Sequence, residues 1–203
     1  MSTSAKAIEI MKTMPAATIY EAAGKFGDMD PSIRCLTPGA RMAGPAFTLR
    51  TKPGDNLGVF LAIHEAPAGS VLVIDGGGTL KVTIWGGTST LSAVQKGIVG
   101  CVTNAGVRDL EEIIENKFPV FGPGVTVRGT VKNHQGWIGI PICIGDVTVS
   151  PGDFVFGDAD GVVVVPADRI EEVATAAAEQ RRKELEWDRR IRAGESGKVV
   201  MGL

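Results

Sequence analysis

The most regular alternation of hydrophobic and polar positions lies between residues 82 and 117. Val82–Trp85 and Ile98–Thr103 are runs of β-branched and aliphatic residues, which are typical of buried strands. Between them, Thr88–Lys96 has apolar residues at helical spacing and is followed by Gly97, a residue that commonly ends a helix. A second helix is expected to end near Lys117. This strand–helix–strand–helix order predicts a βαβ unit, whose crossover makes the two strands parallel.

The rest of the chain predicts a mixed arrangement around this unit. Before it, the pattern indicates helices at Ala5–Met14, Thr18–Phe26 and Leu57–His64, and strands within Ala40–Thr51 and at Val71–Ile74. Thr18 and Asn56 are the candidate N-caps of the second and third of these helices. After it, short runs separated by glycine, proline and aspartate predict antiparallel strands at Val125–Thr130, Trp137–Ile144, Val147–Val149, Phe154–Phe156 and Val162–Val165. A charged helix with a modest apolar stripe is expected from Ala167 to about Arg192. Because no repeat or linker divides the chain, we expect one α/β domain over residues 1–203 that ends in this helix.

Composition narrows the class of protein. Of the 203 residues, 44% are hydrophobic and 22% are charged, an ordinary balance for a globular protein. The net charge of −2 argues against electrostatic binding of nucleic acid. No apolar run resembles a signal peptide or a membrane span. The three scattered cysteines indicate free thiols, with Cys101 and Cys143 expected to be buried. We therefore expect a reduced, cytoplasmic protein that binds neither nucleic acid nor membranes.

Two loops that follow the predicted parallel strands carry the candidate chemistry. The first loop consists of Gly86, Gly87, Thr88 and Ser89. It lies at a helix start, where glycine lets the backbone approach a ligand and unpaired N–H groups favour a carboxylate or phosphate. The second loop offers the guanidinium of Arg108, suited to a carboxylate or enolate, and the carboxylate of Asp109, suited to Mg²⁺ or Mn²⁺. Because the carboxyl ends of parallel strands share one sheet edge, we expect a single site for a small oxo-acid.

Each of these residues also has a simpler explanation. The two glycines of the first loop are compatible with a tight strand-to-helix turn. Asp109 could be a helix N-cap, with Glu112 completing an arrangement like a capping box. Arg108 could be a solvated surface residue. The local pattern alone leaves these alternatives open.

Other polar residues are weaker candidates. His64 and His134 lie far apart without ligand spacing, so each is expected to be a surface or capping residue. Gly76–Gly78 follows a strand but lacks the G-x-G-x-x-G spacing of a dinucleotide loop. Asp158 and Asp160 are expected to form a turn, although they could also reach a neighbouring subunit's site.

Four longer segments resemble a known family. They are AGPAFTLRT, GIVGCVTNAGVRD, FPVF and VSPGDFVFGDADGVVVVP. A loop residue, Gly87, also precedes the Arg-Asp pair by a twenty-residue gap. Over nearly its whole length the chain resembles the RraA-like, class II pyruvate-aldolase family. That family includes 4-hydroxy-4-methyl-2-oxoglutarate and 4-carboxy-4-hydroxy-2-oxoadipate aldolases and the regulator of ribonuclease E activity.

The resemblance implies a compact fold of swivelling β/β/α type that forms trimers or hexamers with sites at subunit interfaces. It implies that Asp109 binds a divalent metal, Mg²⁺ or Mn²⁺, and that Arg108 contacts the substrate. The backbone of the loop from Gly86 to Ser89 would cradle the pyruvoyl carboxylate. The implied reaction is cleavage of a 4-hydroxy-2-oxo acid to pyruvate through a stabilised enolate, with decarboxylation of oxaloacetate as a side activity. A water organised by the metal is the expected base.

One position departs from the family pattern. Many members carry an acidic residue where this chain has Gly87, so a candidate for holding the catalytic water is absent. A hydroxyl of Thr88 or Ser89 could replace it. The departure leaves two alternatives to the aldolase. One is a non-catalytic regulatory protein that binds a ribonuclease or another protein partner, and the other is a decarboxylase without aldolase activity.

Overall fold

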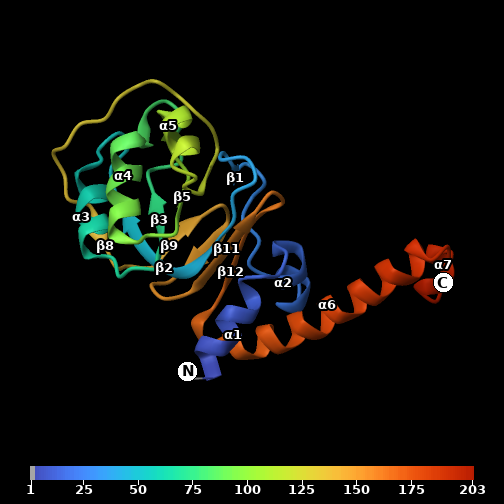
Figure 1. Ribbon diagram of the computed structural model, residues 1–203. Coiled ribbons are helices and arrows are strands. Elements are labelled where there is room, and N and C mark those ends of the chain that lie inside the picture. The colour runs from blue at the N-terminus through green and yellow to red at the C-terminus, as the bar shows by residue number, and fades with distance from the viewer. Residues whose placement is uncertain (1–2) are drawn as a thin grey trace.

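A central sheet runs through the structure, a computed structural model that describes residues 3–203 (Figure 1). Its strands are β1 (Arg34–Cys35), β2 (Met42–Arg50), β3 (Val71–Asp75), β5 (Gly100–Thr103), β7 (Val120–Gly122), β8 (Trp137–Ile138), β11 (Phe154–Asp158) and β12 (Gly161–Val165). The order is β1-β7-β5-β3-β2-β11-β12, and β8 pairs with one end of β2. The four strands β7, β5, β3 and β2 are mutually parallel, whereas the outer pairs are antiparallel. The sheet therefore combines parallel and antiparallel strands, and of the two strands of the predicted βαβ unit it contains only β5.

The helices form two groups (Figure 1). They are α1 (Thr3–Met11), α2 (Ala16–Ala22), α3 (Leu57–Glu65), α4 (Gly87–Lys96), α5 (Leu110–Glu115), α6 (Ile170–Arg192) and α7 (Gly197–Val200), with a 3-10 turn at Ala167–Arg169. Helices α3, α4 and α5 connect successive parallel strands and lie together, while α1, α2 and the first part of α6 lie against β11 and β12. The rest of α6 extends away and carries α7 and the C-terminus (Figure 1). In residues 3–203, every helix is too short or too polar to cross a membrane.

Strand β3 shows how the sheet is buried on both faces. Leu72 and Ile74 pack in the cluster beneath α3, α4 and α5, whereas Val71 and Val73 point to the opposite face. All four side chains are fully buried. A strand covered on both faces has no polar side to display, which explains the uninterrupted apolar run in the sequence.

The predicted order of strand, helix, strand and helix is present, but the predicted βαβ pairing of its two strands is wrong. Strand β4 (Thr83–Trp85) pairs with the short strand β6 (Gly106–Val107) in a separate two-stranded parallel sheet, not with β5. A Cβ at Gly106 would stand 2.9 Å from the carbonyl oxygen of Val82, so glycine permits this close pairing. Because β4 and β6 are parallel neighbours, the loops that follow them still emerge side by side.

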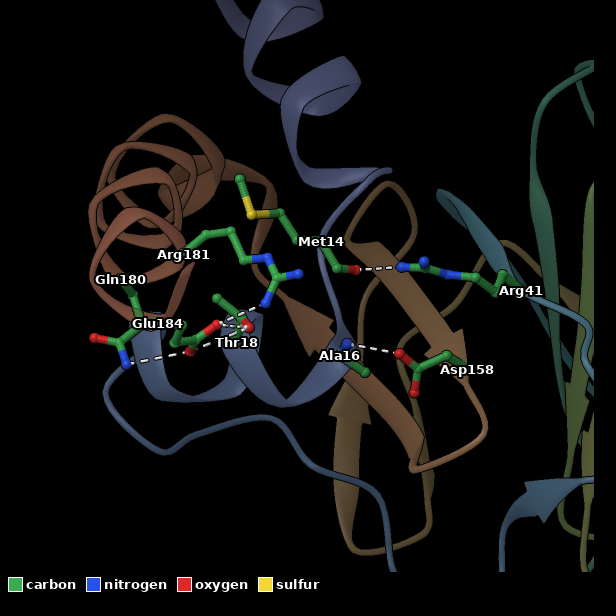
Figure 2. Close-up of polar contacts among 8 residues, drawn as sticks. All are labelled: Met14, Ala16, Thr18, Arg41, Asp158, Gln180, Arg181 and Glu184. Atoms are coloured by element: carbon green, nitrogen blue, oxygen red, sulfur yellow. Dashed lines mark hydrogen bonds and ion pairs between the residues drawn. The ribbon is translucent and has the colours of Figure 1, made fainter. Parts of the chain in front are cut away.

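Polar contacts join the N-terminal helices to α6 and to β11 (Figure 2). Helix α2 begins at Ala16, whose N–H donates to Asp158 Oδ2 at 2.8 Å. Thr18 therefore lies inside the helix, and the prediction that Thr18 is its N-cap is wrong. Its hydroxyl instead donates to Glu184 of α6 at 3.0 Å, and Arg181 donates to the same carboxylate at 3.2 Å. Asp158 also accepts from the N–H of Asp160, which confirms the predicted turn.

The region after β7 contains less strand than the sequence predicts. Val125–Thr130 is an extended segment held by isolated bridges at Val125 and Val131. Trp137–Ile144 is divided by a bend at Gly139, where φ is +71°, into β8 and β9 (Ile142–Ile144). Strand β9 then forms a hairpin with β10, whose bounds are Val147–Val149.

The cysteines are all free, but their burial differs from the prediction. Cys101 is buried, as expected, whereas Cys143 is exposed and Cys35 is half-buried. Cys143 lies at the middle position of β9, between two buried isoleucines. Because successive side chains of a strand point to opposite faces, burying both neighbours directs this thiol to solvent.

Candidate active site

A small cavity lies where β4 and β6 end. Its volume is about 120 Å³. Twelve residues line it: Asn56, Phe60, Thr83, Ile84, Trp85, Gly86, Thr88, Ser89, Arg108, Asp109, Thr130 and Lys132. The two loops singled out in the sequence therefore share one cavity, although the strands that place them are β4 and β6.

The carboxylate of Asp109 is held by the neighbouring loop. Its Oδ2 accepts a hydrogen bond from the N–H of Gly87 at 3.1 Å and lies 3.4 Å from Nε of Arg108. Asp109 occupies the N-cap position of α5, yet its side chain makes no capping hydrogen bond there. The local capping explanation is therefore wrong, because the carboxylate binds the start of α4 instead.

The second oxygen of this carboxylate is available to a ligand. Within residues 3–203 no hydrogen bond or ion pair involves Oδ1 of Asp109, and 36% of the side chain is exposed. The backbone here is left-handed, with φ of +54° and ψ of +41°. Such a conformation costs on the order of 1 kcal/mol and is tolerated best by aspartate and asparagine among the non-glycine residues. Strain of this kind is common where a side chain must be aimed at a ligand.

Gly86 makes the close contact between the loops possible. A Cβ at this position would stand 2.8 Å from Asp109 Oδ2 and 3.2 Å from Cγ of Arg108. Further along α4, Thr88 and Ser89 line the cavity, and a helix leaves the N–H groups of its first turn without partners inside the helix. These groups are suited to the carboxylate of a small acid. Gly86, Thr88 and Ser89 of the predicted cradle therefore line the cavity.

Gly87 has a different surrounding from the other three loop residues. It does not line the cavity, and its N–H is occupied by the Asp109 carboxylate. The side on which a Cβ would stand faces the carboxylate of Glu112 in α5. Gly87 therefore holds the metal-binding candidate in place and is not positioned to bind the substrate itself.

Sequence reasoning missed the opposite wall of the cavity. Asn56 precedes α3, Phe60 lies within it, and Lys132 follows the extended segment after β7. Nζ of Lys132 lies 5.6 Å from the centre of the Phe60 ring. The buried carboxylate of Asp55 fixes this wall by accepting hydrogen bonds from the N–H of Asn133 at 3.0 and 3.2 Å. No motif in the sequence connects residues 56 and 132, because their proximity arises only from folding.

The charges around the cavity favour an anionic ligand. Arg108 and Lys132 contribute two positive charges, and Asp109 contributes one negative charge. The first-turn N–H groups of α4 add partial positive charge. These three side chains together carry a net charge of +1, which a carboxylate ligand offsets.

The residues present fit a hard divalent cation with few protein ligands. In residues 3–203 no three His, Cys, Asp or Glu side chains are grouped to hold a metal together. Mg²⁺ commonly keeps several waters and is bound through one or two carboxylates plus ligand oxygens. Asp109 Oδ1, beside a cavity for a small acid, suits that mode of binding. His134 is occupied as a loop cap, since its Nδ1 accepts from the N–H of Gly136 at 2.9 Å.

Comparison with known proteins identifies the family of this chain. Residues 16–164 match the RraA-like family model, described as Aldolase/RraA. The chain belongs to the RraA-like family. A protein of Halalkalibacterium halodurans, named "Putative 4-hydroxy-4-methyl-2-oxoglutarate aldolase", is 35% identical over 90% of this chain and 85% of its own length.

Two solved structures show that the fold is that of RraA-like proteins. The crystal structure of an uncharacterised protein from Pseudomonas syringae superposes with a TM-score of 0.87 and 26% identity, covering 97% of each chain. The RNA-processing inhibitor RraA from Thermus thermophilis gives a TM-score of 0.69 and 30% identity over 75% of this chain and 92% of its own. The predicted family and the predicted α/β fold are therefore confirmed.

Proposed function

We propose that this RraA-like protein is a divalent-metal-dependent class II pyruvate aldolase. It cleaves a 4-hydroxy-2-oxo acid to pyruvate and decarboxylates oxaloacetate as a side activity. The observation that carries the proposal is the Asp109 carboxylate, with one oxygen held by Gly87 and Arg108 and the other oxygen free beside a cationic cavity. The name of the H. halodurans relative supports an aldolase-type activity.

Each part of the cavity has a role in this reaction. Asp109 would hold Mg²⁺ or Mn²⁺, which supplies Lewis-acid polarisation of the 2-oxo group when bound. The N–H groups of Thr88 and Ser89 bind the carboxylate of the substrate beside that group. Arg108 donates hydrogen bonds to the oxygens on which negative charge develops.

The bond changes are those of a retro-aldol reaction. A base removes the proton of the 4-hydroxyl, a carbonyl forms at C4, and the C3–C4 bond breaks. The electron pair of that bond goes to C3 and gives the enolate of pyruvate, which is then protonated at C3. Oxaloacetate reaches the same enolate by losing carbon dioxide, so stabilisation by Arg108 serves both reactions. We propose that a water held beside Asp109 is the base.

The decisive experiment compares Asp109→Asn with the wild-type protein. Asparagine keeps the shape of the side chain and tolerates the left-handed backbone, but it removes the charge. With Mg²⁺ or Mn²⁺ present, we expect pyruvate release from 4-hydroxy-2-oxo acids and from oxaloacetate by the wild type. We expect a loss of 100-fold or more in Asp109→Asn, with a melting temperature close to that of the wild type. Glu115→Gln, which neutralises an exposed carboxylate of the same helix, is the matched control. Unchanged activity in Asp109→Asn, or no pyruvate from any acid tested, would reject the aldolase.

The likeness to the RNA-processing inhibitor RraA favours a second candidate function. In this second function, the chain is a regulatory protein that binds a ribonuclease or another protein partner. The test is RNA cleavage by a ribonuclease of the RNase E type with and without this chain. Inhibition that persists in Asp109→Asn, in a protein that releases no pyruvate, would support this function over the aldolase.

We also propose that the chain assembles into trimers or hexamers with the cavity at a subunit interface. Arg108 and Asp109 are both partly exposed at the cavity, so a neighbouring subunit has room to cover them. The projecting part of α6 also displays apolar side chains, including Leu185 and Ile191. Sedimentation equilibrium measures the assembly directly, and a monomer at micromolar concentration would reject this proposal.

A further inference from the structure

Lys132 brings a positive charge to the cavity without an acidic partner. Within residues 3–203, no hydrogen bond or ion pair involves its ammonium, whereas Arg108, the other cation of the cavity, lies 3.4 Å from Asp109. The Lys132 ammonium instead stands over an aromatic ring, because its Nζ lies 5.6 Å from the centre of the Phe60 ring. A cation within about 6 Å of a ring centre is attracted by the negative face of the ring.

Core packing does not explain the aromatic side chain of Phe60. Helix α3 contributes residues such as Val59 and Ile63 to the core cluster beneath it, but Phe60 belongs to none of the clusters formed by the described residues. Phe60 is half-buried and lines the cavity. The other large apolar side chains of the lining, Ile84 and Trp85, are fully buried. Among these apolar side chains, only Phe60 therefore offers an appreciable surface to the contents of the cavity.

The backbone fixes the separation of the lysine from the ring. The N–H of Val131, which precedes Lys132, donates to the carbonyl oxygen of Gly54 at 2.8 Å. The N–H of Asn56 donates back to the carbonyl oxygen of Val131 at 3.0 Å, and α3 begins at the next residue. Phe60 follows in the first turn of that helix. The backbone of Lys132 is thus attached to the start of the helix that carries the ring, and only the flexible lysine side chain needs a further restraint.

We propose that Phe60 is a positioning residue whose ring holds the Lys132 ammonium at the cavity for a carboxylate of the bound acid. This inference rests on the proposed function. A free lysine side chain loses rotamer entropy when a ligand fixes it, and a ring that already attracts the ammonium reduces that loss. A ring suits this task better than a carboxylate would, because it leaves the charge and the N–H donors of the lysine to the ligand.

The place of Lys132 decides which carboxylate it binds. In the proposed function, the first turn of α4 and the cation at Asp109 bind the 2-oxo acid end, whereas Lys132 comes from the opposite wall. The ammonium therefore serves the carboxylate at the far end of an acid such as 4-hydroxy-2-oxoglutarate or 2-oxoglutarate. Pyruvate has no such group, so its affinity should not depend on Phe60.

The test is a double-mutant cycle with Phe60→Leu and Lys132→Met. Leucine keeps an apolar side chain but removes the ring face, and methionine removes the charge. With Mn²⁺ present, calorimetric titration with 2-oxoglutarate should give a Kd about three- to fivefold larger for Phe60→Leu than for the wild type. In the Lys132→Met background, Phe60→Leu should change the Kd by less than about 1.5-fold, since the ring has no cation to hold. Phe60→Tyr, which keeps a ring face, should restore the wild-type affinity.

Kinetic constants separate positioning from damage to the fold. For 4-hydroxy-2-oxoglutarate, Phe60→Leu should raise KM by about three- to fivefold and change kcat by less than about twofold. Inhibition by pyruvate should be unchanged. Phe26→Leu, which removes an exposed phenylalanine that does not line the cavity, is the matched control and should change none of these values.

Nuclear magnetic resonance tests the contact without any ligand. Reductive methylation with carbon-13 formaldehyde labels the lysines, and the ring current of a nearby phenylalanine shifts a labelled methyl signal upfield. The Lys132 signal, assigned by its loss in Lys132→Arg, should lie upfield of the signals of other exposed lysines. In Phe60→Leu it should move to their position, and an unmoved signal would overturn the contact.

Three results of the titrations would overturn the inference. A loss of affinity for 2-oxoglutarate that is equal in both backgrounds would show that the ring acts on the acid or on the fold, and not through Lys132. An unchanged Kd in Phe60→Leu would show that the ring does not position the cation. No binding of 2-oxoglutarate by the wild type would show that the cation does not serve a carboxylate.

Failure of the proposed function can be told apart from failure of this inference. Coupling between Phe60 and Lys132 in the titrations, without pyruvate release from any acid, would reject the aldolase alone. Pyruvate release without that coupling would reject the role of Phe60 alone.

Discussion

Replacing Gly86 by alanine should weaken cation binding at Asp109. The new Cβ would stand 2.8 Å from Oδ2 of that carboxylate, which is closer than side chains in proteins approach, so the carboxylate must rotate. The backbone itself does not resist the change, because φ of Gly86 is −164°, an extended value that any residue adopts. The effect should therefore fall on the carboxylate and on the neighbouring Arg108 side chain.

The hydrogen bond that holds the carboxylate sets the size of the effect. Rotation of Asp109 breaks the 3.1 Å bond from the N–H of Gly87 to Oδ2. Hydrogen bonds to charged groups contribute about 1.5–3 kcal/mol, and the partial exposure of Asp109 argues for the lower end of this range. A loss of about 1.4 kcal/mol of binding free energy corresponds to a tenfold larger dissociation constant. We therefore expect Gly86→Ala to raise the Kd for Mn²⁺ by about tenfold.

Gly87→Ala is the matched control. Its Cβ would overlap Oε2 of Glu112, but that atom ends a flexible, exposed side chain that can turn into solvent. Alanine also favours the helical conformation over glycine by up to about 1 kcal/mol. We expect a Kd for Mn²⁺ within about twofold of the wild type and no fall in melting temperature. Titration of Mn²⁺ followed by electron paramagnetic resonance measures both variants. Equal affinities for the two variants would refute this account of the loop.

Two further predictions concern the cysteines and the start of α2. Burial raises the pKa of the Cys35 thiol, and burial raises the pKa of Cys101 well above its usual value, whereas Cys143 is exposed. A raised pKa delays thiolate formation to higher pH, so alkylation near pH 8 followed by peptide mass spectrometry should label Cys143 first. Asp158→Ala removes the acceptor for the N–H of Ala16 and should lower the free energy of unfolding by about 1 kcal/mol. Urea denaturation measures that loss, and an unchanged midpoint would contradict it; Mn²⁺ affinity should stay unchanged.

The sequence predicted the parts of the fold that depend on local periodicity. The buried runs at β3 and β5 and the helix that stops at Gly97 lie where the pattern places them, and Gly97 has φ of +78°. What the pattern could not predict is which strands pair. Strand β6 has only two residues, so it gives no periodic signal, and its pairing with β4 depends on close packing at Gly106. The two candidate loops were thus correctly predicted to meet, but the sheet that joins them was not.

Prediction from the sequence was limited in the same way for single residues of the candidate site. Arg108 and Asp109 were found because their residue types and the family resemblance point to chemistry. Asn56 was interpreted as a helix cap, since asparagine before an apolar helical segment usually is one. Only the three-dimensional structure shows that Asp55 takes over the capping hydrogen bond and that the Asn56 amide oxygen is buried without a partner in the described residues. Lys132 lies in an extended segment without any pattern, so nothing local distinguishes it from other surface lysines.

The side of Gly87 on which a Cβ would stand faces helix α5. An acidic side chain there would start from a Cβ that overlaps Glu112, so the two carboxylates could coexist only if Glu112 moved away. In this chain a carboxylate already stands at that edge of the site, but it comes from α5 and not from α4. Glu112 is exposed, and its carboxylate lies on the side of Gly87 where a Cβ would stand. The departure from the family pattern therefore removes an acidic side chain from α4, while the acidic side chain of Glu112 in α5 occupies the space beside Gly87.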